Sequence, residues 1–264
     1  MSLLEARGVS IAFGGVRALS DVELDVEAGE IVGIIGANGA GKTTLFDYLS
    51  GITPGTGTVR LDGVDISELP PHERARAGLG RSFQDARLFH SLTVLDTLRV
   101  ASERHRPVGT GVIATLIGLP SARTGEQAAT KRAQQLVDEF RLGAYRDKLV
   151  GELSTGTRRV VDLACLFIQQ PAVVLLDEPS SGIAQREAEA LAPLLLKVRD
   201  DLGCALVLIE HDMPLVLGLA ERMYALETGR VIAHGTPADV VADPDVIRSY
   251  LGDDPSAINR SGRA

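Results

Sequence analysis

A glycine-rich loop near the start of the chain carries the most specific chemical pattern in the sequence. The residues in it that we expect to bind phosphate are Gly36, Asn38, Gly39, Ala40, Gly41, Lys42, Thr43 and Thr44. Glycines allow the backbone to curl so that successive N–H groups point at phosphate oxygens, and a helix that opens at Lys42 adds the positive end of its dipole. Lys42 then brings a positive charge to the β- and γ-phosphates, and the Thr43 hydroxyl is a ligand for Mg²⁺. The pattern predicts that the chain binds a nucleoside triphosphate together with Mg²⁺.

An acidic pair far downstream has the chemistry that such a loop requires. Asp177 and Glu178 directly follow the apolar run 173–176. We expect the Asp177 carboxylate at the carboxyl end of a strand, where open α/β sheets bind ligands and where it can hold Mg²⁺ through water. Glu178 can accept a proton from the water that attacks the γ-phosphate, or orient that water. The alternative is that the two acids only begin a surface loop.

The apolar patterns predict an α/β core that positions these groups. The β-type run 30–35 leads directly into the glycine loop, and residues 44–49 continue from it as a helix. The β-type runs 173–176 and 205–209 flank a helical pattern at 185–200. This alternation is typical of a parallel, doubly wound sheet with helices on its faces.

Three other regions have residue patterns that differ from those of this core. Residues 9–13 and 22–26 are β-type runs expected to form antiparallel strands beside the nucleotide site, and 126–140 is a helical pattern within a candidate helical subdomain. The C-terminal part predicts β-type runs at 223–226 and 230–233 and a helix at 237–250, before a polar, frayed tail at 253–264. The apolar segment 109–120 either contacts a membrane or partner, or folds onto the helical subdomain.

Composition narrows the class of protein. The chain has 264 residues, of which 45% are hydrophobic, enough for a sizeable core. Its formal net charge of −8 argues against nucleic acid as a partner, because binding phosphate backbones requires a basic face. No run approaches the roughly 20 apolar residues that span a bilayer, and residues 1–7 lack the pattern of a signal peptide. We therefore expect a cytoplasmic location.

The two cysteines do not indicate a disulfide or a metal site. Cys165 and Cys204 both lie in apolar runs, which is typical of buried, reduced thiols. No Cys/His cluster has metal-ligand spacing, so the only metal that we expect is the Mg²⁺ carried with the nucleotide.

Three further motifs, together with the loop and the acidic pair, connect the chain to a known family. They are RSFQ at 81–84, LSTGT at 153–157 and EHD at 210–212. With them, the chain resembles ATP-binding cassette (ABC) proteins over nearly its full length. Four regions of the sequence resemble, more narrowly, the ATP-binding subunits of branched-chain amino acid importers. These regions are residues 30–46, 82–84 with 87–89, 209–213 and 229–237.

The resemblance implies an architecture. It is a single ABC ATPase domain over 1–264, with a P-loop NTPase core, an antiparallel β subdomain and an α-helical subdomain inserted at about 85–155. It also implies ATP and Mg²⁺ as cofactors. The implied partners are transmembrane permease subunits, a second ATPase subunit (identical or paralogous) and, indirectly, a solute-binding protein. The chain would then lie peripherally on the inner face of the cell membrane.

The resemblance assigns roles to several residues. It implies Glu178 as the catalytic base, Lys42 as charge stabiliser, and Gln84 and His211 as groups that sense the γ-phosphate. Gln84 would also reach Mg²⁺, beside Thr43 and Asp177. Alternatively, Gln84 is an ordinary polar residue of the surface and His211 is a structural histidine.

The signature motif and the proposed adenine contact each have two interpretations. Ser154 and Gly156 match the family positions that touch the γ-phosphate of the opposite protomer, whereas a hydroxyl here is also typical of an ordinary helix N-cap. Phe13 stands where the family stacks an aromatic on adenine, or else is a core aromatic. The sequence departs from the family pattern at Thr155, Thr157 and Ala184.

These observations favour the ATP-hydrolysing subunit of a membrane transporter, with branched-chain amino acids or related small solutes as cargo. The departures motivate an alternative, an ATP-dependent dimerising regulatory module with a weak or silent site. A soluble ABC ATPase of chromosome maintenance or translation would need heptad arms or tandem cassettes, which this sequence lacks.

Overall fold

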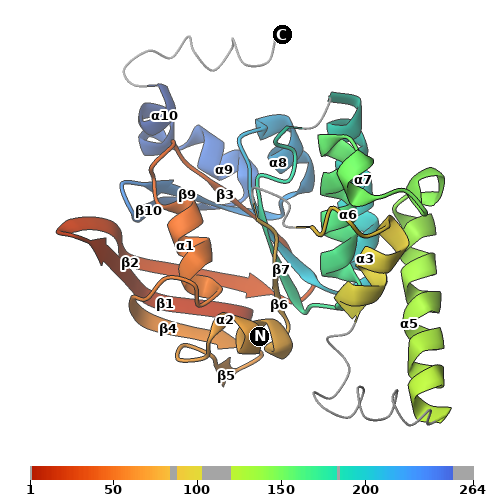
Figure 1. The fold of residues 1–264 in the computed structure, drawn as a ribbon. Helices are drawn as coiled ribbons and strands as arrows, with labels where there is room; N and C mark the ends of the chain where they lie inside the picture. The colour runs from red at the N-terminus through yellow and green to blue at the C-terminus, as the bar shows by residue number, and fades with distance from the viewer. Residues whose placement is uncertain (1, 84–87, 103–119, 183–184, 252–264) are drawn as a thin grey trace.

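A six-stranded sheet forms the centre of the molecule. The computed structural model describes residues 2–83, 88–102, 120–182 and 185–251 (Figure 1). The strand order is β10-β9-β3-β8-β7-β6, with β3 at Ile31–Ile35, β6 at Leu79–Arg81, β7 at Val173–Asp177, β8 at Ala205–Ile209, β9 at Arg222–Glu227 and β10 at Arg230–Gly235. All neighbours run parallel except β10, which pairs antiparallel with β9. This arrangement confirms the predicted parallel α/β core.

The central strands are buried on both faces. Every residue of β3, β7 and β8 is buried. Val173 and Leu175 belong to one apolar cluster, whereas Val174 and Leu176 belong to the cluster on the opposite face. This alternation follows from the two-residue period of a strand, and it explains why the run reads as continuously apolar. Burying each Leu contributes about 1.5–3 kcal/mol.

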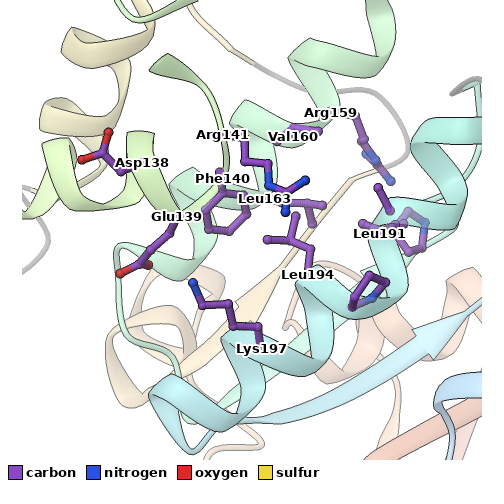
Figure 2. A pocket seen from close by; sticks show the side chains of 13 residues that line it. Asp138, Glu139, Phe140, Arg141, Arg159, Val160, Leu163, Leu191, Leu194 and Lys197 are labelled. Carbon is purple, nitrogen blue, oxygen red and sulfur yellow. The ribbon is translucent and has the colours of Figure 1, made fainter. Parts of the chain in front are cut away.

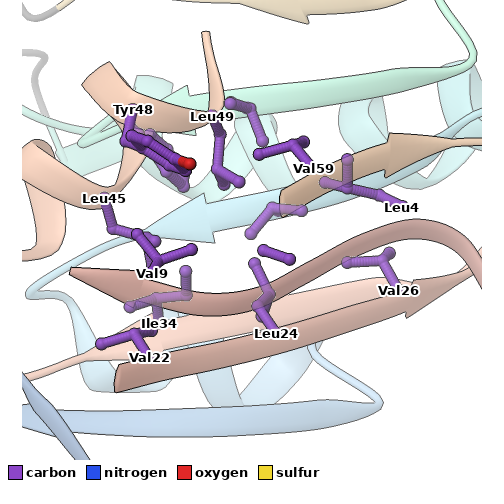
Figure 3. Packing of buried hydrophobic residues seen from close by; sticks show 14 of the residues in the cluster. Leu4, Val9, Val22, Leu24, Val26, Ile34, Leu45, Tyr48, Leu49 and Val59 are labelled. Atoms are coloured by element: carbon purple, nitrogen blue, oxygen red, sulfur yellow. The ribbon is translucent and has the colours of Figure 1, made fainter. Parts of the chain in front are cut away.

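An antiparallel sheet packs against one side of this core. It has the order β2-β1-β4-β5, with β1 at Ser2–Phe13, β2 at Val16–Glu27, β4 at Thr56–Leu61 and β5 at Val64–Asp65. Helix α1 (Lys42–Leu49) contributes Leu45 and Leu49 to the cluster that joins this sheet to β3 (Figure 3). The predicted strands 9–13 and 22–26 are therefore parts of longer strands, and α1 is held between the two sheets.

Helices gather on the other side of the core (Figure 1). They are α3 (Val94–Ala101), α5 (Pro120–Glu139), α6 (Thr155–Phe167) and α7 (Gln185–Leu202), with 3₁₀ turns at Gly143–Tyr145 and Val150–Glu152. Helix α8 (Met213–Leu219) joins them through Leu215 and Leu219, whereas α2 (Pro71–Ala77) lies beside β6 and the end of α1. A second apolar cluster joins α3, α5, α6 and α7 to β7 and β8, so these helices cover the other face of the sheet.

The predicted C-terminal helix at 237–250 is wrong in one respect, because two helices occupy this region. Helix α9 spans Pro237–Ala242, and α10 spans Pro244–Leu251. Asp243 between them is extended, with φ −64° and ψ 127°. The physical reason is Pro244, which lacks an N–H donor and disfavours the helical conformation of the residue before it. The tail at 253–264 lies outside the described residues.

Candidate nucleotide-binding site

The glycine loop joins the end of β3 to the start of α1. Gly36 and Gly41 have φ of 152° and 104°. A Cβ at Gly36 would lie 2.3 Å from the carbonyl oxygen of Leu226, and one at Gly41 would lie 2.8 Å from that of Ala18. Both positions therefore require glycine for space as well as for backbone conformation.

Lys42 is turned toward the backbone of its own loop. Its Nζ donates to the carbonyl oxygens of Gly36 at 2.6 Å and Ala37 at 3.0 Å. The residue is only 6% exposed. Burial lowers the pKa of the ammonium, whereas the negative charges of Glu178 and Asp177 raise it. Lys42 is thus electrostatically coupled to the acidic pair Asp177 and Glu178.

Asp177 ends β7 and is held from two sides. Its backbone N–H donates to Ser82 Oγ at 3.0 Å, and its carbonyl oxygen accepts from Arg159 Nη2 at 2.8 Å. The side chain is 5% exposed, and burial raises the pKa of its carboxyl while the nearby Arg81 guanidinium lowers it. The carboxylate is therefore fixed at the carboxyl end of the strand, as predicted.

Glu178 and His211 come from neighbouring strand ends and meet. The parallel register pairs Asp177 with Ile209, which places the residues after β7 and β8 side by side. Glu178 Oε1 lies 2.8 Å from His211 Nε2, and the Glu178 N–H donates to the Ile209 carbonyl oxygen at 2.8 Å. The structure therefore brings together two residues that the sequence places 33 positions apart.

Glu210 supports this pair. It is 2% exposed, and its carboxylate accepts from the Ser180 N–H at 2.7 Å, the Ser180 hydroxyl at 2.8 Å and the His211 N–H at 3.2 Å. Burial raises the pKa of Glu210, and these hydrogen bonds lower it. Glu210 thereby ties the segment after Glu178 to the segment that carries His211.

Arg81 is a site residue whose role the sequence motifs do not reveal. Its guanidinium lies 2.6 Å from Asp47 Oδ1 and 3.7 Å from Asp177 Oδ2, and its side chain is 7% exposed. It also lies over the rings of Phe46 at 5.9 Å and Phe83 at 5.2 Å. Arg81 therefore links α1, β6 and β7. Its place directly before Ser82 in the RSFQ motif was the available signal, but the sequence does not reveal its partners.

Comparison with known proteins places the chain in a family. A family model described as ABC transporter matches residues 19–181. The high-affinity branched-chain amino acid transport ATP-binding protein BraF of Pseudomonas aeruginosa is 38% identical over 252 residues, which cover 95% of this chain and 98% of BraF. The chain belongs to the ABC transporter family. It is the ATP-binding, ATP-hydrolysing subunit of such a transporter.

Further relatives of this ABC ATPase agree on the family and differ in cargo. A second model, described as Branched-chain amino acid ATP-binding cassette transporter, matches residues 230–255. The lipopolysaccharide export system ATP-binding protein LptB of Escherichia coli K12 is 36% identical over 96% of this chain and 99% of LptB. A crystal structure of a nucleotide-free ATP-binding cassette from an ABC transporter aligns with a TM-score of 0.80 and 26% identity, covering 96% of this chain and 100% of that one. Fold and family are therefore shown, whereas the named cargoes of the relatives are not the same.

The signature segment of this ABC ATPase begins α6. Ser154 is its N-cap, and Ser154 Oγ accepts from the Thr157 N–H at 3.1 Å and lies 2.9 Å from Thr157 Oγ1. The N-cap interpretation is thus correct within the chain. Gly156 lies in the first turn, where backbone N–H groups have no intrahelical acceptor. Such an end of a helix suits an anion, so the cap does not compete with the role that the resemblance implies.

Phe13 lies at the end of β1, opposite Val16. The two side chains are 52% and 71% exposed. The alternative that Phe13 is a core aromatic is therefore wrong, because its ring lies at the surface of the antiparallel sheet.

Several predicted features fall outside the described residues. They are Gln84, Ala184 and residues 109–119 of the apolar segment. The cysteines are described: Cys165 and Cys204 are free thiols, and Cys204 is fully buried while Cys165 is only partly so. Within the described ranges, no helix is both long and apolar enough to cross a bilayer.

A cavity of about 470 Å³ lies between α5, α6 and α7 (Figure 2), and no residue of the glycine loop is among those that line it. Its walls include Phe140, Leu163, Leu191 and Leu194. Arg159 also lines it, and the same guanidinium donates to the carbonyl oxygens of Asp177 and Glu178. The cavity is therefore separate from the phosphate loop but shares one wall residue with the acidic end of β7.

Proposed function

We propose that this ABC ATPase powers the import of branched-chain amino acids or related small solutes. The observation that carries the choice of cargo is the match of residues 230–255 to the model described as Branched-chain amino acid ATP-binding cassette transporter. The similarity to BraF over nearly the whole of both chains supports it. The amino-acid sequences of the motifs at 82–84 and 209–213 also favour the branched-chain amino acid importers.

The donors at the site fit ATP with Mg²⁺. Within the described part of the chain, no cluster of three or more His, Cys, Asp or Glu side chains could hold a metal ion by itself. This suits an ion that arrives with a nucleotide, because Mg²⁺ is usually held by one or two protein oxygens together with phosphates. Thr43 and Asp177 supply a hydroxyl and a carboxylate of the required hard-oxygen type, and Gln84 is a third proposed ligand. The N–H groups of the loop at 36–44, other than that of Gly36, which donates to Tyr250, would hold the phosphates.

The roles at the reacting end follow from the chemistry of each side chain. Glu178 would accept a proton from the attacking water. His211, hydrogen-bonded to Glu178 at 2.8 Å, would orient that carboxylate and contact the γ-phosphate. Lys42 would neutralise charge that develops on the phosphates, and Gln84 would position the water. Phe13, exposed at the end of β1, is the proposed adenine contact.

The proposed working unit contains two ATPase subunits. Each ATP would lie between the loop of one copy and Ser154 and Gly156 of the other, in a homodimer or in a heterodimer with a paralogous subunit. Residues 85–155 would form the helical subdomain of the single cassette domain. Transmembrane permease subunits would hold the dimer at the inner face of the membrane, and a solute-binding protein would act through them. The net charge of −8 supports the expectation that nucleic acid is not a partner.

Solute uptake tests the cargo. In the host of this protein, deletion of its gene is expected to abolish high-affinity uptake of radiolabelled leucine, isoleucine and valine. Wild-type chain should restore uptake, and Glu178→Gln should not, although it accumulates to the same level. Undiminished uptake in the deletion strain, accompanied by loss of lipopolysaccharide from the cell surface, would instead assign the chain to an exporter of the kind for which LptB is named.

A further inference from the structure

The C-terminal helix α10 reaches the first residue of the nucleotide loop. The hydroxyl of Tyr250 accepts a hydrogen bond from the backbone N–H of Gly36, across 214 positions of sequence. Helix α10 packs beside α9 and β10 (Figure 1). Nothing in the glycine-rich pattern itself predicts this contact, because the pattern describes only how the loop meets phosphate.

Gly36 is held by side chains at both of its polar groups. Its N–H donates to Tyr250, and its carbonyl oxygen accepts from Lys42 Nζ at 2.6 Å. The backbone of Leu226 leaves no room for a side chain at Gly36, since a Cβ would lie 2.3 Å from the Leu226 carbonyl oxygen. Gly36 has no side chain to pack, so its position depends on the hydrogen bonds that its backbone makes.

These two contacts differ in what ATP would do to them. Lys42 would leave the Gly36 carbonyl oxygen when its ammonium turns to the phosphates. Tyr250 lies on another helix, so its bond to the Gly36 N–H does not have to break. We propose that Tyr250 is a positioning residue for the nucleotide loop, whose hydroxyl holds Gly36 at the end of β3 in a conformation ready for the phosphates. The proposal rests on the assignment of residues 36–44 as the ATP site.

Helix α10 is anchored independently of this hydroxyl. Val246 is 4% exposed and belongs to a cluster that also contains Ile35, the residue before Gly36. Asp243 Oδ1 accepts from the N–H groups of Asp245 at 2.8 Å and Val246 at 3.4 Å at the start of the helix. Removing only the hydroxyl of Tyr250 should therefore leave α10 in place.

The hydroxyl is also suited to a constant role. The residue is 39% exposed, but burial raises the pKa of its phenol. Tyr250 consequently stays neutral at physiological pH and presents the same acceptor to Gly36 throughout that range.

The test compares two tyrosines that each lose one hydroxyl. Tyr250→Phe removes the acceptor for Gly36, and Tyr48→Phe removes a hydroxyl that donates to the Gly57 carbonyl oxygen at 2.8 Å, outside the site. ATP affinity is measured without Mg²⁺ by fluorescent-nucleotide displacement, KM and kcat by phosphate release, and stability by thermal unfolding, all on the full-length chain. Lys42→Ala serves as the variant that is expected to lose ATP binding.

For Tyr250→Phe we expect ATP binding weakened about fivefold, equivalent to about 1 kcal/mol for one hydrogen bond. KM should rise by about the same factor with kcat within about twofold, because a loop that is held less well weakens binding of the substrate and of the transition state equally. Tyr48→Phe should match it in thermal stability and keep wild-type ATP affinity.

Three results would overturn the proposal. Wild-type ATP affinity in Tyr250→Phe would show that the hydroxyl does not position the loop, and with Lys42→Ala inactive the ATP site itself would stand. Equal loss of affinity in Tyr48→Phe would show that the effect follows general stability. Normal ATP binding by Lys42→Ala would overturn the site assignment and this proposal with it.

Discussion

Glu178 Oε1 and His211 Nε2 lie 2.8 Å apart at the ends of two adjacent parallel strands. Glu178 adopts φ 47°, a left-handed conformation that is uncommon outside glycine. Its N–H is bonded to the Ile209 carbonyl oxygen at 2.8 Å, which helps to hold this turn. The arrangement presents one carboxylate oxygen to an imidazole that can hold it in a fixed orientation.

Replacing Glu178 by Gln should separate binding from turnover. The amide keeps the size of the side chain but cannot accept a proton from water, so ATPase activity should fall by at least about 100-fold. ATP affinity should stay within about threefold of wild type, because the loop is untouched. Steady-state phosphate release and equilibrium ATP binding provide the measurements. Unchanged turnover would remove Glu178 from the mechanism.

The histidine can be compared with another histidine of the same chain. His211→Ala should lower kcat by about 10-fold or more, since Glu178 loses its hydrogen-bond partner. His234→Ala is the control, because His234 is exposed and lies 5.6 Å from the Tyr224 ring rather than at the site. Phosphate release by both variants decides the matter. Equal losses of activity would argue against a special role for His211.

Two N-caps distinguish stability from function. Ser154 caps α6, and Thr93 caps α3 by accepting from the Asp96 N–H at 3.1 Å. Substituting either by Ala should cost about 1 kcal/mol in the free energy of unfolding. Only Ser154→Ala should also reduce ATPase activity beyond that expected from stability, because Ser154 is proposed to face the second ATP. Similar activity in the two variants would leave Ser154 as a cap alone.

Two glycines with positive φ separate crowding from backbone strain. Gly36→Ala places a Cβ 2.3 Å from the Leu226 carbonyl oxygen, whereas a Cβ at Gly63, with φ 74°, would have no other atom within 4 Å. Gly63→Ala should cost about 1–2 kcal/mol from conformation alone. Gly36→Ala should cost clearly more and abolish ATP binding, as measured by chemical unfolding and nucleotide titration. Normal ATP binding by Gly36→Ala would contradict the loop geometry.

The buried carboxyl of Asp162 should make the free energy of unfolding depend on pH. Burial raises the pKa of its carboxyl to about 6, against the lowering effect of Arg159. Since the folded pKa exceeds the unfolded value of 3.8, the folded chain binds more protons between these two values, and stability falls as pH rises from about 4 to 6. Above pH 6 the penalty is constant, on the order of 2–3 kcal/mol.

Asp162→Asn should therefore stabilise the chain by about 5 °C at pH 8 and by almost nothing at pH 4. Asp147→Asn, at a side chain that is 83% exposed, is the control and should change the unfolding temperature little at either pH. Thermal unfolding across this pH range gives the answer. A gain that is the same at pH 4 and pH 8 would show that the effect is not ionisation of Asp162.

Local patterns predicted much of the fold and part of the site. The run before Gly36 and the run before Asp177 are predicted as strands because each is short, almost wholly apolar and rich in β-branched residues. The prediction of a single helix at 237–250 is wrong, although the apolar pattern continues through Pro244. The break between the two helices depends on the backbone restriction that this proline imposes on Asp243.

The amino-acid sequence by itself determined the glycine loop, the acidic pair after a buried strand, the α/β class and the family, because each depends on residues close together in the chain. Only the tertiary structure decided that Arg81 lies between Asp47 and Asp177, that His211 meets Glu178, and that Tyr250 holds Gly36. These partners lie on different strands and helices, and the strand order of the central sheet together with the packing of α1 and α10 brings them together. Such contacts follow from packing of distant elements, which no local periodicity encodes.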